Sequence, residues 1–416
     1  MQFAQNPSRK STFPIIVHSH LRWDWVWQRP QQFLSRLSKT HPILFIEGPH
    51  LVAGNSDPQT FWRRDPQFPN IVVMHTEFSQ ERWDKAHGPS VDVERYRLLR
   101  QASDGPLKGE FDQKSNGAIQ WFYDPMAAPA FVGRMNERAN VYDCMDELSQ
   151  FKGAPPELIE RERFLLSRAD VVFTGGRKMW ESKSRFNSNC HFYGCGVDVP
   201  HFATAREATT NVPDDVAALA NPTLGYFGVV DERLDYELIA KLADANSNWN
   251  ICMVGPVCKV DESEFPQRAN LHWLGGREYS ALPAYAKKFD VCLMPFAMNE
   301  ATEFINPTKA LEYMATGTPI VSSSVPDVVS NFSSVVQIAR THDEFITQCR
   351  QAIESPNQSA IERGLKMASE NTWEVIVAKM ENHIEQALVA RTASLQREKI
   401  VVSPLPSVAS SSAVAA

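Results

Sequence analysis

Short apolar runs alternate with amphipathic stretches along most of the chain. Residues 13–17, 43–46 and 71–74 are apolar runs of strand length, and residues 30–37 between the first two carry apolar positions at helical spacing. A strand, a helix and a strand within about 35 residues predict a βαβ unit, which implies a parallel sheet with a right-handed crossover. The same alternation predicts further strands at 119–123, 140–143 and 170–174 and a helix at 156–167.

A second series of the same kind begins after residue 221. It predicts strands at 223–227, 250–254, 271–274, 290–294 and 319–322 and helices at 235–242, 282–288 and 308–315. Residues 201–221 are rich in Ala, Thr, Asp and Pro and are typical of a linker. We therefore expect an α/β protein with two doubly wound halves that face each other across a cleft. The expected boundaries are 1–200, 222–371, a helix at 372–396 that packs on one or both halves, and a disordered tail at 397–416.

The composition narrows the class of protein. Of 416 residues, 43% are hydrophobic and 22% charged, and 42 Lys and Arg against 49 Asp and Glu give a net charge of -7, which argues against nucleic acid as the main partner. No apolar stretch approaches the roughly 18 residues of a membrane helix, so we expect a cytoplasmic protein, with peripheral contact to the inner face of the membrane left open. Seven cysteines without a CxxC pair favour a reducing compartment and argue against a structural zinc site.

A dinucleotide fingerprint is absent after the first predicted strand, where HSHLRWDWVWQRPQ replaces GxGxxG. This lowers the expectation of an oxidoreductase. Two doubly wound halves place a ligand where the carboxyl ends of their strands meet. The fold alone is shared by dehydrogenases, periplasmic binding proteins, sugar epimerases and glycosyltransferases, so the function depends on specific side chains.

The most informative stretch is residues 295–323, where a predicted strand is followed by a polar loop and a helix. Asn306 is placed as the N-cap, and Thr308 and Lys309 lie in the first helical turn, an arrangement that suits a phosphate or diphosphate. Glu312 lies about 6 Å farther along the helix, which is the reach from a diphosphate to its ribose. The alternative is that Lys309 and Glu312 form an ordinary surface ion pair.

The segment from Glu312 to Pro319, EYMATGTP, resembles the donor-binding motif of GT-B glycosyltransferases, specifically of glycosyltransferase family 4. In that motif a first glutamate precedes the second by eight positions, but Phe304 stands there in this chain, and Glu303 is the neighbouring substitute for a catalytic role. The stretches CGVDVPHF (195–202), LGYFGVVDERLD (224–235) and 271–296 resemble further segments of the same family.

The resemblance assigns further residues to the nucleotide-sugar donor, whose domain is the C-terminal one. It implies Arg233 and, with less support, Lys259 as contacts of the donor phosphates, and Gly275 and Arg277 as neighbours of the nucleobase. A solvated loop charge is the alternative for Arg233. Together with Asn306, Thr308, Lys309 and Glu312, these residues form the predicted donor site.

The N-terminal half is assigned to the acceptor. Residues 23–37 resemble the start of a bacterial subgroup that makes surface polysaccharides, including the teichuronic acid type, so Trp25 is expected to stack on acceptor sugars, with Arg29 beside it. The alternative is that Trp25 and Trp27 belong to the core. His18 and His20 are expected to line the acceptor side.

Two aspartates follow a predicted strand of this half. Asp143 and Asp146 are expected to orient or deprotonate an acceptor hydroxyl, and the alternative is that they cap the following segment.

The resemblance implies a metal-independent enzyme that transfers a sugar, with retention, from a nucleoside diphosphate donor to a glycan or lipid-linked acceptor. We expect a UDP-linked donor, a role in bacterial polysaccharide biosynthesis, and no cofactor, because the nucleotide sugar is a substrate. Two alternatives remain at this point: a nucleotide-sugar epimerase of the same fold, and a binding protein without catalysis. The sequence does not set the oligomeric state.

Overall fold

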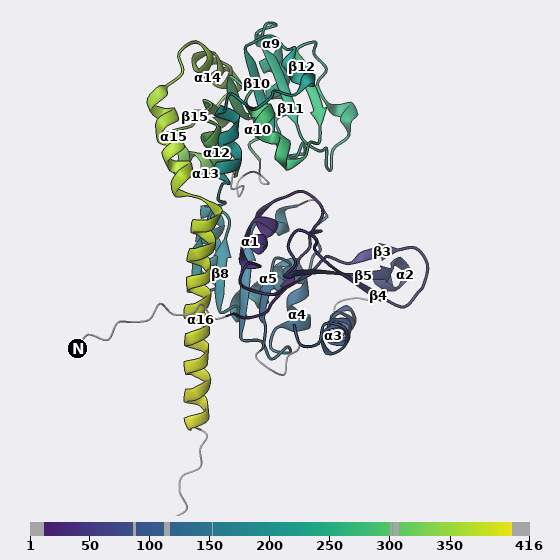
Figure 1. Cartoon of the computed structure of the whole chain (residues 1–416). Helices are drawn as coiled ribbons and strands as arrows, with labels where there is room; N and C mark the ends of the chain where they lie inside the picture. The colour runs from purple at the N-terminus through teal and green to yellow at the C-terminus, as the bar shows by residue number, and fades with distance from the viewer. Residues whose placement is uncertain are drawn as a thin grey trace, which may run out of the picture.

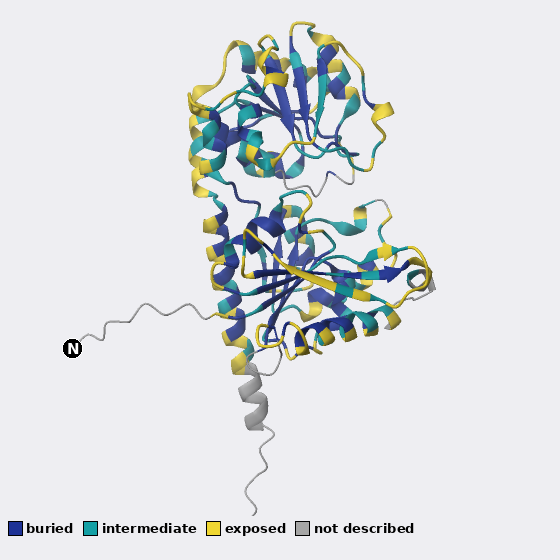
Figure 2. Cartoon of the chain, turned by 45° about the vertical axis from the view of Figure 1, so that its right-hand side comes forward, coloured by how far each residue is buried: buried dark blue, intermediate teal, exposed yellow. Residues whose placement is uncertain are grey.

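The computed structural model of the chain describes residues 12–85, 89–111, 117–151, 153–299, 302 and 308–401. Two β-sheets with their helices lie one above the other, and the long helix α16 (Trp373–Val401) runs along one side of the first sheet (Figure 1). The strands of both sheets are largely buried, and exposed residues gather on outer helix faces and loops (Figure 2). The model therefore has the α/β architecture that the hydrophobic pattern predicts.

The first sheet has nine strands among the described residues, in the order β3-β5-β2-β1-β6-β7-β8-β9, with β4 paired to β5. All of its pairs are parallel except β4 with β5. The strands are β1 (Ile15–His18), β2 (Ile43–Ile46), β3 (His50–Val52), β4 (Gln59–Arg64), β5 (Ile71–Ser79), β6 (Ile119–Phe122), β7 (Ala139–Cys144), β8 (Val171–Thr174) and β9 (Cys190–Phe192). The helices are α1 (Arg29–Leu37), α2 (Gln80–Lys85), α3 (Pro89–Asp104), α4 (Ala128–Phe131), α5 (Leu158–Arg168) and α6 (Arg177–Lys183).

Apolar side chains cover both faces of the first sheet. Residues of α1 and α16 form one core with the sheet, and residues of α3, α4 and α5 form a second core on the opposite face. Every residue of β1, β6 and β7 is buried, as expected for parallel strands covered on both sides.

The hydrophobic pattern did not predict the edge of this sheet. β4 pairs antiparallel with β5. Together with β3 and α2, these two strands form a flap that projects from the edge of the sheet (Figure 1). Most residues of β4 are exposed, including Phe61 and Trp62, so the strand carries no buried apolar run by which it is recognised.

The second sheet has six strands among the described residues, all parallel, in the order β12-β11-β10-β13-β14-β15. They are β10 (Thr223–Phe227), β11 (Asn250–Val254), β12 (Leu271–Gly275), β13 (Val291–Met294), β14 (Ile320–Ser323) and β15 (Gln337–Ala339). The helices are α7 (Val199–Ala203), α8 (Asp214–Ala217), α9 (Tyr236–Ala245), α10 (Leu282–Ala286), α12 (Thr308–Thr316), α13 (Pro326–Phe332), α14 (His342–Glu354) and α15 (Gln358–Glu370). Short 3-10 turns are η1 (Pro125–Ala127), η2 (Leu148–Gln150), η3 (Thr204–Arg206), η4 (Glu262–Glu264) and η5 (Tyr279–Ala281). The strands predicted at 223–227 and 250–254 have these same bounds in the structure.

Local sequence explains where several of these helices begin. The carboxylate of Asp235 accepts the backbone N–H of Leu238 at 2.8 Å and caps α9, and the side chains of Thr341 and Asn357 cap α14 and α15 in the same way. The predicted linker also contains helical structure, because α7 ends, and η3 and α8 lie, between residues 201 and 221.

Helix α16 joins the two halves. It follows α15 of the second half and buries Trp373, Met380 and Ile384 in the core of the first. A Cβ on Gly196 would lie 2.7 Å from the backbone nitrogen of Trp373, so this glycine is needed where the helix begins. No helix among the described residues is long and apolar enough to cross a membrane.

Further contacts connect the two halves directly. The backbone N–H of Arg177, at the start of α6, donates to the carboxylate of Asp327 on α13 at 3.0 Å. The side-chain amide of Gln32 on α1 donates to the hydroxyl of Tyr279 at 3.4 Å. The carboxyl end of the first sheet therefore lies against the second half of the chain.

Candidate functional site

A lysine and a glutamate lie at the carboxyl end of the second sheet, and neither side chain has a hydrogen-bond or ion-pair partner among the described residues. Lys309 is the second residue of α12, and its ammonium lies 5.7 Å from the centre of the Tyr226 ring. Burial lowers its pKa, which the charge of nearby Glu312 partly opposes, and burial raises the pKa of Glu312, which Lys309 partly opposes. Neither side chain makes a hydrogen bond or ion pair within the described residues. The fold therefore holds both charges here without a hydrogen bond or an ion pair to another described residue.

The backbone after β10 shapes the space around Lys309. Gly228 has φ +149°, and a Cβ there would lie 1.9 Å from Cε and 2.5 Å from Nζ of Lys309. A Cβ on Gly255, with φ +159°, would in turn lie 1.7 Å from the carbonyl oxygen of Gly228. Only glycine fits at both positions, so the close approach of this loop to Lys309 is built into the sequence.

Arg233 lies in the same loop, beside Asp231. Its Nε and Nη2 donate to the carboxylate of Asp231, at 2.9 Å and 2.6 Å for the shortest contacts. Burial lowers the pKa of Arg233, but the hydrogen bonds to Asp231 and the surrounding negative charge, that of Asp231 first, together raise it above its usual range. Its remaining Nη1 makes no hydrogen bond within the described residues, so one edge of the guanidinium stays open.

The first half of the chain faces this cluster through the loop after β7. The charge of Asp146 acts on Arg233 across the boundary, and the Asp146 carboxylate has no hydrogen-bond partner among the described residues. Lys259, which has φ +60°, places its ammonium 4.3 Å from the Phe151 ring of the first half. The structure thus brings Asp146, Arg233, Lys309 and Glu312 to one boundary.

The predictions that Asp143 is catalytic and that Arg29 binds the acceptor are wrong. Arg29 Nη2 donates to Asp143 at 2.7 Å and Nη1 donates to the carbonyl of Tyr193 at 2.7 Å. Asp143 is fully buried and Arg29 is 3% exposed, so neither can touch an acceptor. Burial lowers the pKa of Arg29, but the charge of Asp143, its hydrogen bonds and further neighbouring groups together raise it, as in a structural ion pair.

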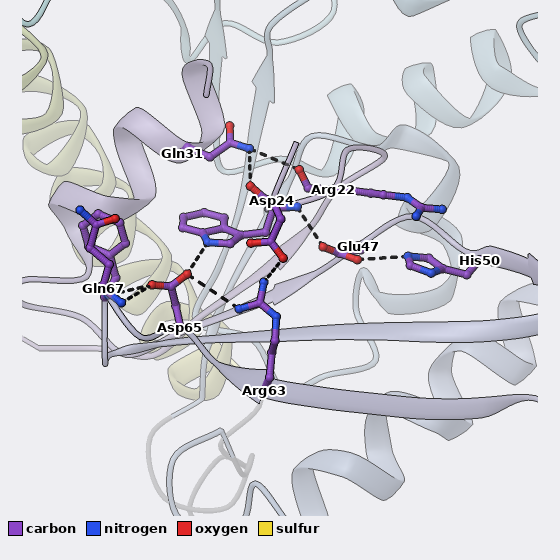
Figure 3. Close-up of polar contacts among 10 residues, drawn as sticks. Arg22, Asp24, Gln31, Glu47, His50, Arg63, Asp65 and Gln67 are labelled. Atoms are coloured by element: carbon purple, nitrogen blue, oxygen red, sulfur yellow. Dashed lines mark hydrogen bonds and ion pairs between the residues drawn. The ribbon is translucent and has the colours of Figure 1, made fainter. Parts of the chain in front are cut away.

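The predicted acceptor segment after β1 is anchored by a polar network. Figure 3 shows the anchoring residues: the indole of Trp23 donates to Asp65 at 2.7 Å, its backbone N–H donates to Glu47 at 2.9 Å, and Gln31 donates to the carbonyl of Arg22. This network leaves Trp25 outside the core, with 51% of its surface exposed. The alternative of core packing therefore fails for Trp25.

The two predicted histidines differ. His18 is buried, stacks 4.2 Å from Phe131, and pairs with Gln120 at 2.7 Å. Burial lowers its pKa to about 3, so the ring is neutral near pH 7. His20 is partly exposed, and its Nδ1 is buried with no partner in the structure. The expectation that both line the acceptor side stays a prediction.

Two further donor-site predictions fall at the end of β12. Gly275 has φ +71°, which suits glycine. Arg277 donates to Asp215 on α8 at 2.8 Å and to the Tyr285 hydroxyl at 2.6 Å. Its guanidinium is thus held by groups on neighbouring helices, and its expected place beside the nucleobase stays a prediction.

Part of the predicted donor loop lies outside the described residues. Glu303 and Asn306 belong to this part, so their predicted roles are not placed by the structure. Thr308 is the first residue of α12 and is partly buried. Within the described residues, no group of three or more His, Cys, Asp or Glu side chains is arranged to hold a metal ion.

Sequence reasoning missed two residues that shape this boundary and one that lines a pocket in the first half. Gly228 and Asp231 lie within the quoted stretch 224–235, and Gly228 follows the predicted strand directly, as a close-approach glycine does. Arg95 on α3 was also missed, because nothing in its surroundings along the chain marks it; it lines a pocket in the first half.

The sequence comparisons agree on one class of protein. Residues 221–355 match the family model described as Glycosyl transferases group 1, which covers the second sheet and most of its helices. The chain is 24% identical over 214 residues to a protein of Bacillus subtilis (strain 168) whose name assigns it to teichuronic acid biosynthesis as a glycosyltransferase. That match covers 45% of this chain, and the chain spans about half (50%) of the relative's length.

Solved structures with the same arrangement include three sugar-phosphate enzymes. One from E. coli, bound with UDP-2-fluoro glucose, has a TM-score of 0.63 at 14% identity and covers 91% of this chain and 99% of its own. A UDP-forming trehalose-phosphate synthase of Burkholderia xenovorans in complex with glucose-6-phosphate has a TM-score of 0.64 at 14% identity. This match covers 90% of this chain and 99% of the synthase. Sucrose-phosphate synthase of Thermosynechococcus elongatus has a TM-score of 0.62 at 16% identity. This match covers 91% of this chain and 100% of the synthase. These likenesses confirm the predicted GT-B fold, and the sequence matches confirm the resemblance to a glycosyltransferase.

Proposed function

We propose that this chain transfers a sugar from a UDP-linked donor to a glycan or lipid-linked acceptor in polysaccharide biosynthesis. The observation that carries the proposal is the open pair at the start of α12. Lys309 and Glu312 are largely enclosed, carry opposite charges, and make no hydrogen bond or ion pair within the described residues. Enclosing charges without such partners costs free energy, so their arrangement is best explained by a ligand that supplies the contacts.

A nucleoside diphosphate fits the chemistry of this pair. The Lys309 ammonium and the open edge of Arg233 match the negative charge of a diphosphate, and the first turn of α12 adds its positive end. The Glu312 carboxylate can accept hydrogen bonds from two ribose hydroxyls. As the bond to the sugar breaks, charge grows on the diphosphate, and these cationic groups would stabilise it in place of a metal ion.

We assign the acceptor hydroxyl to the first half of the chain, across the boundary from the donor groups. The Asp146 carboxylate has no hydrogen-bond partner among the described residues and its charge acts on Arg233, so it is the proposed group that orients this hydroxyl. Retention of the anomeric configuration is part of the proposal and is read directly from the product by NMR of its anomeric proton.

The comparisons support the substrate classes. One structural neighbour was solved with UDP-2-fluoro glucose and another is named as UDP-forming and holds glucose-6-phosphate. The Bacillus subtilis relative is named for biosynthesis of teichuronic acid. A UDP-linked donor and a sugar acceptor are therefore the substrates to test first.

The test is a panel of UDP-glucose, UDP-glucuronic acid, UDP-N-acetylglucosamine and GDP-mannose, incubated with the full chain with and without acceptor glycans. Release of UDP that needs an acceptor supports transfer. Interconversion of nucleotide sugars without an acceptor would instead establish an epimerase, and binding without turnover would establish a binding protein. Activity that EDTA abolishes and manganese restores would contradict metal independence.

A further inference from the structure

A pocket in the first half of the chain lies at the carboxyl ends of β1, β2, β5 and β6. Met74, Phe78 and Phe131 supply apolar walls, and Arg95 and Thr76 supply polar groups. The carboxyl ends of these strands share the sheet edge from which Asp146 faces the second half. The pocket is therefore on the side from which the proposed acceptor must approach the donor.

Arg95 is the unusual member of this lining. It lies on α3 with its guanidinium 5.9 Å from the Trp83 ring. Burial lowers its pKa, which the charges of Asp124 and Asp92 partly oppose. Within the described residues, Arg95 makes no hydrogen bond or ion pair. All five of its N–H donors are thus without an acceptor among the described residues, although the side chain is largely enclosed.

The neighbouring acids are already engaged elsewhere. Asp124 accepts the backbone N–H of Met126 at 2.9 Å, and Asp92 accepts from Arg161 at 2.9 Å. Both help to keep Arg95 charged without taking up its donors.

The other titratable groups of the lining supply no positive charge that could attract an anion. Glu47 accepts the backbone N–H of Trp23 at 2.9 Å and pairs with His50 at 3.1 Å. His18 is neutral near pH 7. Arg95 is therefore the cation of this lining, and a carboxylate or a phosphate matches its fork of donors in a way that a neutral hydroxyl does not.

We propose that the pocket binds an anionic group of the acceptor, so that Arg95 selects an acceptor sugar that carries a carboxylate or a phosphate. This inference rests on the proposed function, because it names the acceptor class for the same reaction.

The test is a titration of the full chain with glucuronic acid, glucose 6-phosphate and glucose at fixed ionic strength, read by ligand-observed NMR. Arg97 is the matched control, because it lies on the same helix, is exposed and pairs with Glu94. We expect the wild type and Arg97→Gln to bind one anionic sugar at least tenfold more tightly than glucose, and Arg95→Gln to lose that preference. Preference for glucuronic acid identifies a carboxylate, and preference for glucose 6-phosphate a phosphate. Glucose bound as tightly as both anions, or unchanged binding in Arg95→Gln, overturns the inference.

Thermal unfolding separates binding from a structural role. An open charge does not hold the fold together, so we expect Arg95→Gln to melt at the wild-type temperature or above it. A clearly lower melting temperature that Arg95→Lys, which keeps the charge, restores identifies Arg95 as a structural partner of Asp124 and overturns the inference.

A parallel titration with UDP keeps this inference separate from the proposed function. UDP binding without a preference for anionic sugars overturns the inference alone. A preference for anionic sugars that depends on Arg95, in a protein that does not bind UDP, overturns the donor assignment and leaves the anionic pocket in place.

Discussion

Two pairs of enclosed charges lie near the boundary between the halves of this molecule, and they differ in what surrounds them. The pair of Arg29 and Asp143 in the first half is closed: the carboxylate accepts from Nε and Nη2, and backbone carbonyls accept from Nη1. The pair of Lys309 and Glu312 in the second half is open, with no hydrogen bond or ion pair from either side chain within the described residues. A closed pair holds the fold, and an open pair is available to a ligand.

This contrast separates residues that look equivalent along the chain. Asp143 and Asp146 are three positions apart and both follow a predicted strand, yet the first is fully buried against Arg29 and the second faces Arg233. Function is therefore assigned to the charges whose hydrogen-bonding capacity is unused.

The largest expected effect comes from breaking the closed pair. Arg29→Met leaves the Asp143 carboxylate buried without its partner, and we expect a loss of about 3–5 kcal/mol in the free energy of unfolding. Urea denaturation of the full chain measures it. A loss below about 1 kcal/mol would show that this pair does not hold the first half together.

The next effect concerns the open pair. Glu312→Gln keeps the shape but weakens acceptance from two ribose hydroxyls, so we expect UDP to bind about tenfold more weakly, or about 1.4 kcal/mol. The control is 2′,3′-dideoxy-UDP, which lacks both hydroxyls and is expected to bind the variant and the wild type alike. Equal loss for both ligands would sink the ribose assignment.

A smaller effect is expected from pH. Burial lowers the pKa of Lys309, and only its protonated form attracts the diphosphate, so UDP affinity should fall as the pH rises from 7 toward 10 through the lowered pKa. The decline should be between about twofold and tenfold, measured by calorimetry at constant ionic strength. The same slope in Lys309→Met would assign the decline to another group.

The smallest effect is expected from an ion pair that is exposed to water, which serves as the reference for the two enclosed pairs. Arg268 pairs with Asp244 at 2.5 Å, and both side chains are at least 40% exposed. We expect Arg268→Met to change the free energy of unfolding by less than about 0.5 kcal/mol, because water screens such pairs. If Arg268→Met lost as much unfolding free energy as Arg29→Met, burial and full hydrogen bonding would not determine how much an ion pair stabilises the fold.

The strands of both sheets were predictable because their apolar runs are buried on both faces. β2, β10 and β11 have their predicted bounds, and the other predicted strands differ by one or two residues at an end, except β5, which extends five residues farther. β4 was missed because its exposed residues show no such run, and β9 and β15, with three residues each, were too short to stand out.

The candidate site was predictable only in part. The order of residues around Thr308, Lys309 and Glu312 marks a helix start with suitable chemistry, and that local signal needs no tertiary information. The partner of Asp143 lies 114 positions away, and the pairing of Arg277 with Asp215 spans 62 positions, so only the folded chain shows which charges are closed.

The most direct test of the account is UDP binding to Lys309→Met, with exposed Lys241→Met as the control and melting temperatures recorded for both. Methionine keeps the length of the side chain and removes its charge, so Lys309→Met should bind UDP at least tenfold more weakly and melt at or above the wild-type temperature, while Lys241→Met binds normally. Unchanged affinity in Lys309→Met, or a stability loss like that expected of Arg29→Met, would contradict the claim that the open pair is the donor site.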